Sequence, residues 1–232
     1  MKLLKFSIAL TTLSLACITS SFALSEASNT ASSNNASLNM PSTFDHWLIR
    51  ARGLAVLPSA HSTTISAPIY GNVTTISNQI IPELDFTYFF SEHIGTELIL
   101  GTSHHSVTAT GTAVGTVGLG KVWLLPPTLT LQYHFFPHAK FSPYVGAGIN
   151  DTIFYDPNPG STASKITYGN SFGPALQIGA DIPIKNKWSF NIDVKKIFIN
   201  SNVAVTIPAV GTVNTRAYIN PWIIGLGIGY RL

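Results

Sequence analysis

The sequence predicts an all-β protein, an eight-stranded antiparallel transmembrane β-barrel, from three observations. Charged residues make up only 10% of the chain and apolar residues 45%, whereas soluble globular proteins carry roughly a quarter charged residues. Eight segments alternate apolar and polar residues with a period of two, which is typical of strands with one apolar face. The connections between these segments alternate between short and long, as in bacterial barrels with short periplasmic turns and long outer loops.

The clearest strand pair lies within residues 125–150. Polar residues at even positions from Thr128 to His134 alternate with apolar residues at odd positions. A short connector leads to a second alternating segment, 142–150, and strands joined so closely are antiparallel neighbours. The aromatic residues Tyr133 and Phe135 end the apolar face of the first strand, as expected at a membrane interface.

The other six strands are expected on the same alternation. The eight together form an even number, as single-chain bacterial barrels require. After residue 23 no stretch of ~18 apolar residues occurs, so spanning helices are not expected. A soluble β-sandwich is the alternative, but it does not require such regular turn lengths. The six segments are 47–57, 82–91, 96–105, 171–184, 188–199 and 217–232; the long loops are 58–81, 106–126, 153–170 and 200–216.

The N-terminal region predicts export. Residues 1–23 carry two lysines, an apolar run and a small residue at Ala23, which is typical of a secretory signal peptide. Residues 24–44, rich in Ser, Asn and Ala, are expected to form a flexible periplasmic extension, and residues 45–232 the outer-membrane barrel. Cys17 would be removed with the signal, which leaves no thiol for disulfides or metal binding. Loss of Lys2 and Lys5 changes 13 basic against 10 acidic residues to 11 against 10, so no nucleic-acid partner is expected.

Charged residues recur on the predicted inward face. The interior of an eight-stranded barrel is just wide enough for side chains to fill it. Charges there must pair, because burying an unpaired ion is costly. We expect a salt-bridged polar plug, and the alternative is a polar path for ions. The set comprises Arg50, Arg52, Asp85, Glu97, Asp181, Asp193, Lys195 and Arg231.

The first two long loops are more apolar than exposed loops should be. They could line a hydrophobic mouth, or they could extend the strands above the membrane and pack on each other. The expected mouth residues are Leu57, Ile65, Ile81, Trp123, Leu124 and Leu125.

Three prolines near this mouth lack the N–H that a β-ladder needs: Pro126, Pro127 and Pro174. An apolar molecule entering at the loops would meet the polar plug below and this weakened wall beside it. We therefore expect it to leave sideways into the membrane, unless the prolines only end strands.

His104, His105 and Ser106 raise two further hypotheses. Adjacent strand residues point to opposite faces, so the two histidines cannot chelate a metal from a regular strand. His104 and Ser106 share a face, in a pattern similar to outer-membrane lipid A deacylases, but a catalytic triad also needs an acid. Residues 98–150 contain neither Asp nor Glu. No metal, cofactor or catalytic residue is expected.

Four separated blocks carry a resemblance to a known family. In order they read PELDFTYFFSEHIGTELIL, LPPTLTLQYHFFPHAKFSPYVGAGIN, SFGPALQIGADIPIKNKWSFNIDVKKIFI and NPWIIGLGIGYRL. The chain resembles the outer membrane protein W (OmpW) family over most of its length after the signal. One departure is the last residue, Leu232, where such barrels usually end in Phe; this places the efficiency of assembly in question, not the fold.

The resemblance implies a narrow barrel in the outer membrane of a Gram-negative bacterium, with no enzymatic activity. It implies passive uptake of small hydrophobic molecules through an apolar mouth. The expected partners are outer-membrane lipid, small hydrophobic solutes and the barrel-assembly machinery, with the oligomeric state left open. The competing function is a structural or receptor barrel, for phage, bacteriocin or adhesion, with no transport role.

Overall fold

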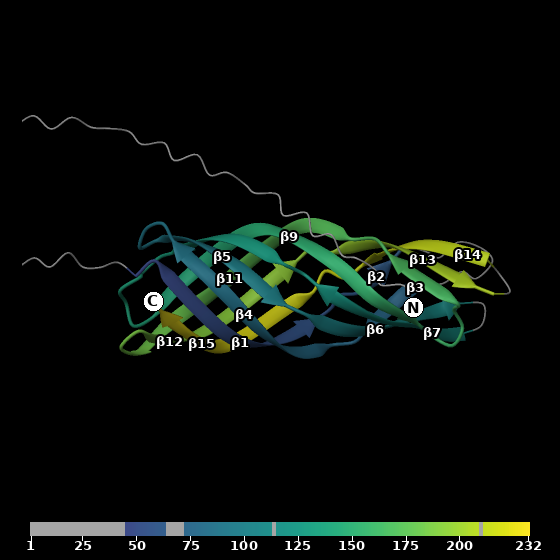
Figure 1. Cartoon of the computed structure of the whole chain (residues 1–232), viewed down its shortest axis with the longest axis horizontal. Coiled ribbons are helices and arrows are strands. Elements are labelled where there is room, and N and C mark those ends of the chain that lie inside the picture. Colours follow the sequence, from purple (N-terminus) through teal and green to yellow (C-terminus); the bar gives the residue numbers. More distant parts are fainter. Residues whose placement is uncertain (1–44, 64–71, 113–114, 209–210) are drawn as a thin grey trace, which may run out of the picture. The chain divides into compact units, whose positions relative to one another are not determined.

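The computed structural model describes residues 45–63, 72–112, 115–208 and 211–232 (Figure 1). The expected signal peptide and N-terminal extension, residues 1–44, lie outside the described residues. Every regular element of the described part is a β-strand. A helix long and apolar enough to cross a membrane is absent from that part of the chain.

Eight strands form a closed antiparallel barrel, which confirms the predicted fold class. Each pairs with the next in the order β11-β12-β15-β1-β4-β5-β8-β9, and β9 pairs with β11 to close the ring. The predicted range of the first strand is correct to the residue. The barrel strands are β1 (Trp47–Leu57), β4 (Gln79–Phe89), β5 (Ile94–Gly101), β8 (Thr128–His134), β9 (Ser142–Pro159), β11 (Ser171–Lys185), β12 (Trp188–Ile197) and β15 (Trp222–Arg231).

The segments predicted as long loops contain strands that continue beyond the barrel (Figure 1). β3 (Asn72–Ile76), β6 (Ser103–Thr112) and β7 (Gly115–Leu125) form a sheet with the far end of β9. β10 (Lys165–Tyr168), β13 (Asn200–Ile207), β14 (Gly211–Tyr218) and β2 (His61–Ser62) form a separate sheet. We call this end of the barrel the loop end and the opposite one the turn end. The long connections are present, and the alternative that their apolar residues extend the strands and pack on each other is the one that the structure supports.

Outward and inward faces follow the two-residue period. In β8, Leu131 is 58% exposed whereas the neighbouring Thr130 is 1% exposed. Aromatic residues ring the outer surface at the turn end, where Trp47 packs edge-on against Tyr88 at 5.0 Å between ring centroids. Such a girdle is typical of the boundary of a membrane. The outer surface is therefore an apolar band with an aromatic edge.

We predict that Leu131→Arg lowers the free energy of unfolding by roughly 2–4 kcal/mol, because it places a charge on the lipid face near mid-strand. Leu131→Phe, which keeps the face apolar, is the control and should be close to neutral. Urea titration of the protein folded in lipid vesicles measures both. Equal losses for the two variants would contradict the assignment of the outward face.

Candidate functional site

Arg50 lies at the centre of a buried charge network inside the turn-end half of the barrel. Its guanidinium donates to both oxygens of Asp181, at 3.2 and 2.9 Å, and to Asp85 Oδ1 at 3.1 Å. Its Nη1 also donates to the Thr87 hydroxyl at 2.8 Å. The bidentate contact with Asp181 fixes the plane of the guanidinium. β1 is thereby joined to β4 on one side and to β11 across the barrel.

Arg52 extends the network towards the loop end. Its Nε donates to Glu83 Oε1 at 2.6 Å and its Nη2 donates to Glu97 Oε1 at 2.7 Å. Nη2 also lies 2.8 Å from Asp85 Oδ2. Lys195 Nζ donates to Asp193 and lies 4.0 Å from Glu83 Oε1. Buried charges here are paired, as the expense of desolvation requires.

The structure brings together seven of the eight residues predicted for the plug. Arg231 stands apart, because it lies near the turn end with its guanidinium 4.6 Å from the centre of the Phe89 ring. The prediction omitted Glu83, although it shares the inward face of β4 with Asp85 and the same period would have identified it. Neutral side chains complete the network: Gln132 and Gln177 donate to Glu97, Tyr144 donates to Asp193, and Asn191 donates to Asp181.

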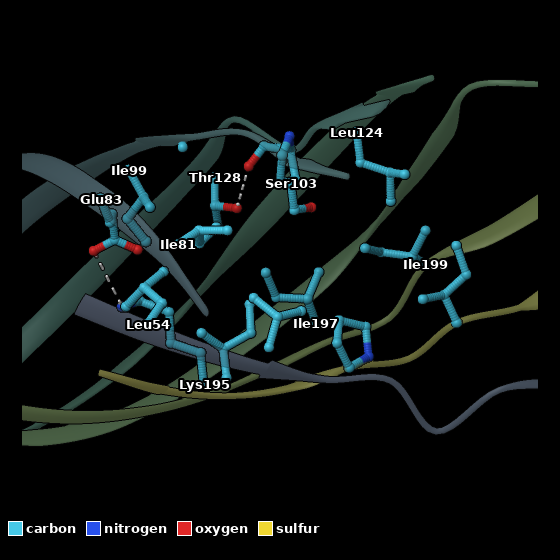
Figure 2. A pocket seen from close by; sticks show the side chains of 16 residues that line it. Leu54, Ile81, Glu83, Ile99, Ser103, Leu124, Thr128, Lys195, Ile197 and Ile199 are labelled. Carbon is cyan, nitrogen blue, oxygen red and sulfur yellow. Dashed lines mark hydrogen bonds and ion pairs between the residues drawn. The ribbon is translucent and has the colours of Figure 1, made fainter. Parts of the chain in front are cut away.

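At the loop end the inward side chains become apolar and surround a cavity of about 40 Å³ (Figure 2). One water needs roughly 10–15 Å³, so the cavity holds a small chemical group and not a whole solute. Glu83 and Lys195 lie at one end, which we call the floor, and Leu124 and Ile199 lie at the other. Beyond it, the inner faces of both loop-end sheets share one apolar cluster. Members of that cluster include Val107, Leu119, Val122, Val203, Val205 and Val213.

Of the residues predicted for the mouth, Ile81 and Leu124 line the cavity. Leu57, Trp123 and Leu125 do not belong to its lining, and Ile65 lies outside the described residues. Trp123 instead stacks on His104 at 4.6 Å on the outer face of β6 and β7. The reason is the strand period, since an inward Leu124 turns both of its neighbours outward.

His105 occupies the inward face opposite to His104, as the strand period predicts. Its Nδ1 lies 2.7 Å from the Ser77 carbonyl oxygen, and its Nε2 lies 3.0 Å from the Ser103 hydroxyl. Burial lowers the pKa of the His105 ring, which favours the neutral form. The ring thus joins β6 to the segment before β4 and holds Ser103 against the cavity.

The wall beside the cavity contains an interruption in the β-ladder. Ile99 is paired with Thr128, and further along the same register Ser103 is paired with Leu124. Between these two pairs, residues 100–102 lie opposite residues 125–127 but are not paired with them. Pro126 and Pro127 lie there and have no N–H to donate. Gly101 and Pro126, which face each other across the interruption, both line the cavity.

Pro174 lies on another part of the wall. It faces outward in β11, opposite Ile149 of β9, within a run of continuous pairs. The ladder is not interrupted there, so this part of the predicted weak wall is not supported. Of the three prolines, only Pro126 and Pro127 lie at an interruption of the ladder.

A sequence profile described as the OmpW family matches residues 45–232. The chain belongs to the OmpW family. It is similar to an uncharacterized outer-membrane protein, y4mB, of Sinorhizobium fredii, with 44% identity over 80% of this chain and 79% of that protein. It is similar to outer membrane protein W of Escherichia coli, with 30% identity over 80% and 87%.

Among solved structures, the crystal structure of the outer membrane protein OprG from Pseudomonas aeruginosa matches with a TM-score of 0.75. The two share 26% identity over 81% of this chain and 96% of that one. This OmpW family member is therefore an outer-membrane protein of the Gram-negative type, and its exposed apolar band contacts membrane lipid.

We predict that Arg52→Met lowers the free energy of unfolding by about 3–5 kcal/mol, because it leaves Glu83, Asp85 and Glu97 buried without this cation. The control is Lys187→Met, which removes a surface pair with Asp45 at 3.0 Å and should cost less than about 1 kcal/mol. Urea unfolding in vesicles measures both. A loss for Arg52→Met no larger than the control would show that the network is not a stabilising core.

Proposed function

We propose that this OmpW family barrel takes up small hydrophobic molecules passively through its loop end and releases them sideways into the outer membrane. The observation that carries the proposal is the position of the cavity. Gly101 and Pro126 line it and also flank the interrupted ladder. An apolar molecule there is beside lipid, at the three opposed positions where no backbone pair joins residues 100–102 to residues 125–127. On its other side Pro127 keeps a backbone hydrogen bond, which its carbonyl oxygen accepts from the Asp151 N–H at 3.1 Å.

The direct route through the barrel is unfavourable for such a molecule. Below the floor, Arg50 and Arg52 hold carboxylates from several strands at 2.6–3.4 Å. An apolar molecule passing this level would separate buried ion pairs, and removal of one partner of such a pair costs several kcal/mol. The residues that form the polar plug therefore favour the lateral exit.

Entry requires the loop end to widen, because a cavity of about 40 Å³ is too small for a solute. The two loop-end sheets belong to separate ladders in the described part of the chain. Their inner faces meet through apolar side chains, and parting them breaks no ladder between them. We infer that the loop end faces the exterior, that residues 1–23 direct export and that the barrel-assembly machinery inserts the chain.

We predict that Leu124→Lys slows uptake of a small apolar probe into protein-containing lipid vesicles by about tenfold or more, because it places an ammonium group in an apolar cavity. Trp123→Lys is the matched control: it is the adjacent residue on the opposite face of β7 and should leave uptake nearly unchanged. If vesicles with wild-type protein take up the probe no faster than protein-free vesicles, a structural or receptor barrel is favoured.

We predict that a disulfide across the interruption, in the variant Gly101→Cys/Pro126→Cys without Cys17, slows uptake several-fold when oxidised and not when reduced. Opposed positions of an antiparallel pair are about the distance that a disulfide spans. The control is Leu98→Cys/Leu129→Cys, a paired position of the intact ladder below. If both oxidised variants take up the probe at the wild-type rate, the lateral route is incorrect.

A further inference from the structure

The floor of the cavity presents one hydrogen-bond acceptor and one donor of opposite charge. Glu83 is 5% exposed and Lys195 is 1% exposed, and both side chains line the cavity (Figure 2). Glu83 Oε1 accepts from Arg52, whereas Glu83 Oε2 accepts no hydrogen bond from the described residues. Lys195 Nζ donates to Asp193 and lies 4.0 Å from Glu83, so its three N–H donors are not all used.

A carboxylate oxygen that accepts no hydrogen bond is available to a ligand, and the Glu83 side chain borders the space that a solute would enter. The remaining lining is apolar apart from the side chains of Ser103 and Thr128. Its carbon-rich walls come from β1, β4, β5, β7, β12 and β15 and the segments beside them, and include Leu54, Val56, Ile81, Ile197, Ile199 and Ile223. A ligand that fits this lining has an apolar body and a single small polar end.

The charges of the floor select among polar ends. A carboxylate end would be repelled by Glu83. The surrounding network already holds more carboxylates than cations: five carboxylates, Glu83, Asp85, Glu97, Asp181 and Asp193, and three cations, Arg50, Arg52 and Lys195. An ammonium end would be repelled by Lys195. A hydroxyl group is neutral, and it can donate to Glu83 while it accepts from Lys195.

We propose that the cavity is a binding site for the hydroxyl end of small aliphatic alcohols, with Glu83 Oε2 as acceptor and Lys195 Nζ as donor. The cavity of about 40 Å³ accommodates the terminal hydroxyl and its carbon. The aliphatic chain then lies towards Gly101 and Pro126, where the wall is interrupted. This proposal rests on the proposed uptake of apolar molecules at the loop end, and it names the class that binds best.

The test compares octane, 1-octanol, octanoate and octylammonium, which share one chain and differ at the end group. The full-length protein in phosphatidylcholine nanodiscs carries ¹³C-labelled isoleucine methyl groups. Ile81, Ile99 and Ile197 report on the cavity. Ile192 and Ile228, on the lipid face, report on non-specific partitioning into the bilayer.

We expect 1-octanol to shift the cavity methyl resonances saturably, with an affinity about five- to tenfold higher than that of octane, as one or two net hydrogen bonds allow. Octanoate and octylammonium should bind more weakly than 1-octanol.

Two variants, Glu83→Gln and Lys195→Met, test the two polar groups separately, and each should reduce the preference for 1-octanol over octane. Glu92→Gln, an exposed residue of a turn, is the control. Heat-modifiable gel mobility confirms folding of each variant.

Equal binding of octane and 1-octanol, or a preference for 1-octanol that persists in both folded variants, would overturn the alcohol site. Octane uptake into vesicles tests the proposed function separately. Uptake that depends on the protein, combined with no preference for the hydroxyl end, overturns only the alcohol site. Saturable binding of 1-octanol without any uptake supports the site and overturns only transport.

Discussion

The burial of Arg50 and Arg52 among carboxylates is the interaction on which the rest of the barrel depends. Eight strands enclose a lumen without room for bulk water, so each guanidinium must replace its hydration with protein acceptors. The two arginines of β1 obtain them from β4, β5 and β11. Arg50 reaches Asp181 on β11, which is three places away in the strand order. The requirement for acceptors thus links strands that no ladder joins directly.

Glycines allow this crowding. A Cβ on Gly227 would lie 2.2 Å from the Ala51 carbonyl oxygen and 2.6 Å from Arg52 Cγ. The stem of Arg52 therefore passes over a strand that presents no side chain at that point. The other inward glycines of β15 make room for neighbouring side chains too, since a Cβ on Gly225 would lie 2.8 Å from Leu54 and one on Gly229 would lie 2.9 Å from Ser189.

The character of the inward face changes at one level of the barrel. On β1, Arg52 is followed by Leu54, and on β12, Lys195 is followed by Ile197, with all four side chains inward. Because several strands change from charged to apolar at the same height, the boundary forms a floor. At that floor the charged groups Glu83 and Lys195 border an apolar cavity, so its chemistry differs from that of both halves of the barrel.

Alternation alone was sufficient to predict the eight strands, their faces and most of the charged network. The two-residue period of a strand places Arg50, Glu97 and Asp193 on the inward face without knowledge of the neighbouring strand.

Alternation does not predict features that depend on how neighbouring strands are aligned or on the exact phase of a strand. Trp123 was placed in the mouth on the apolar character of its segment, whereas its strand phase turns it outward to His104. Pro174 was grouped with Pro126 and Pro127, but only a register shows which proline interrupts a ladder. Extension of the strands at the loop end was one of two alternatives, and its bounds could not be predicted because the glycine and threonine of these segments also favour loops.

The route of least resistance for an apolar molecule follows from which bonds its passage would break. Downward, it meets Arg50, whose side chain makes at least four charged or polar contacts shorter than about 3.5 Å. Sideways, Pro126 and Pro127 have no N–H, so the ladder has already lost those bonds. Across the gap, the Thr102 hydroxyl donates to the Leu124 carbonyl oxygen at 3.1 Å and lies 2.6 Å from the Tyr155 hydroxyl. On the β9 side of the gap, the Pro127 carbonyl oxygen accepts from the Asp151 N–H at 3.1 Å and from the Asn150 side chain at 3.2 Å. A net hydrogen bond contributes only about 0.5–1.5 kcal/mol, far less than an unpaired buried charge costs. For an apolar molecule, the interrupted wall beside the cavity therefore opposes passage less than the charge network beneath the cavity.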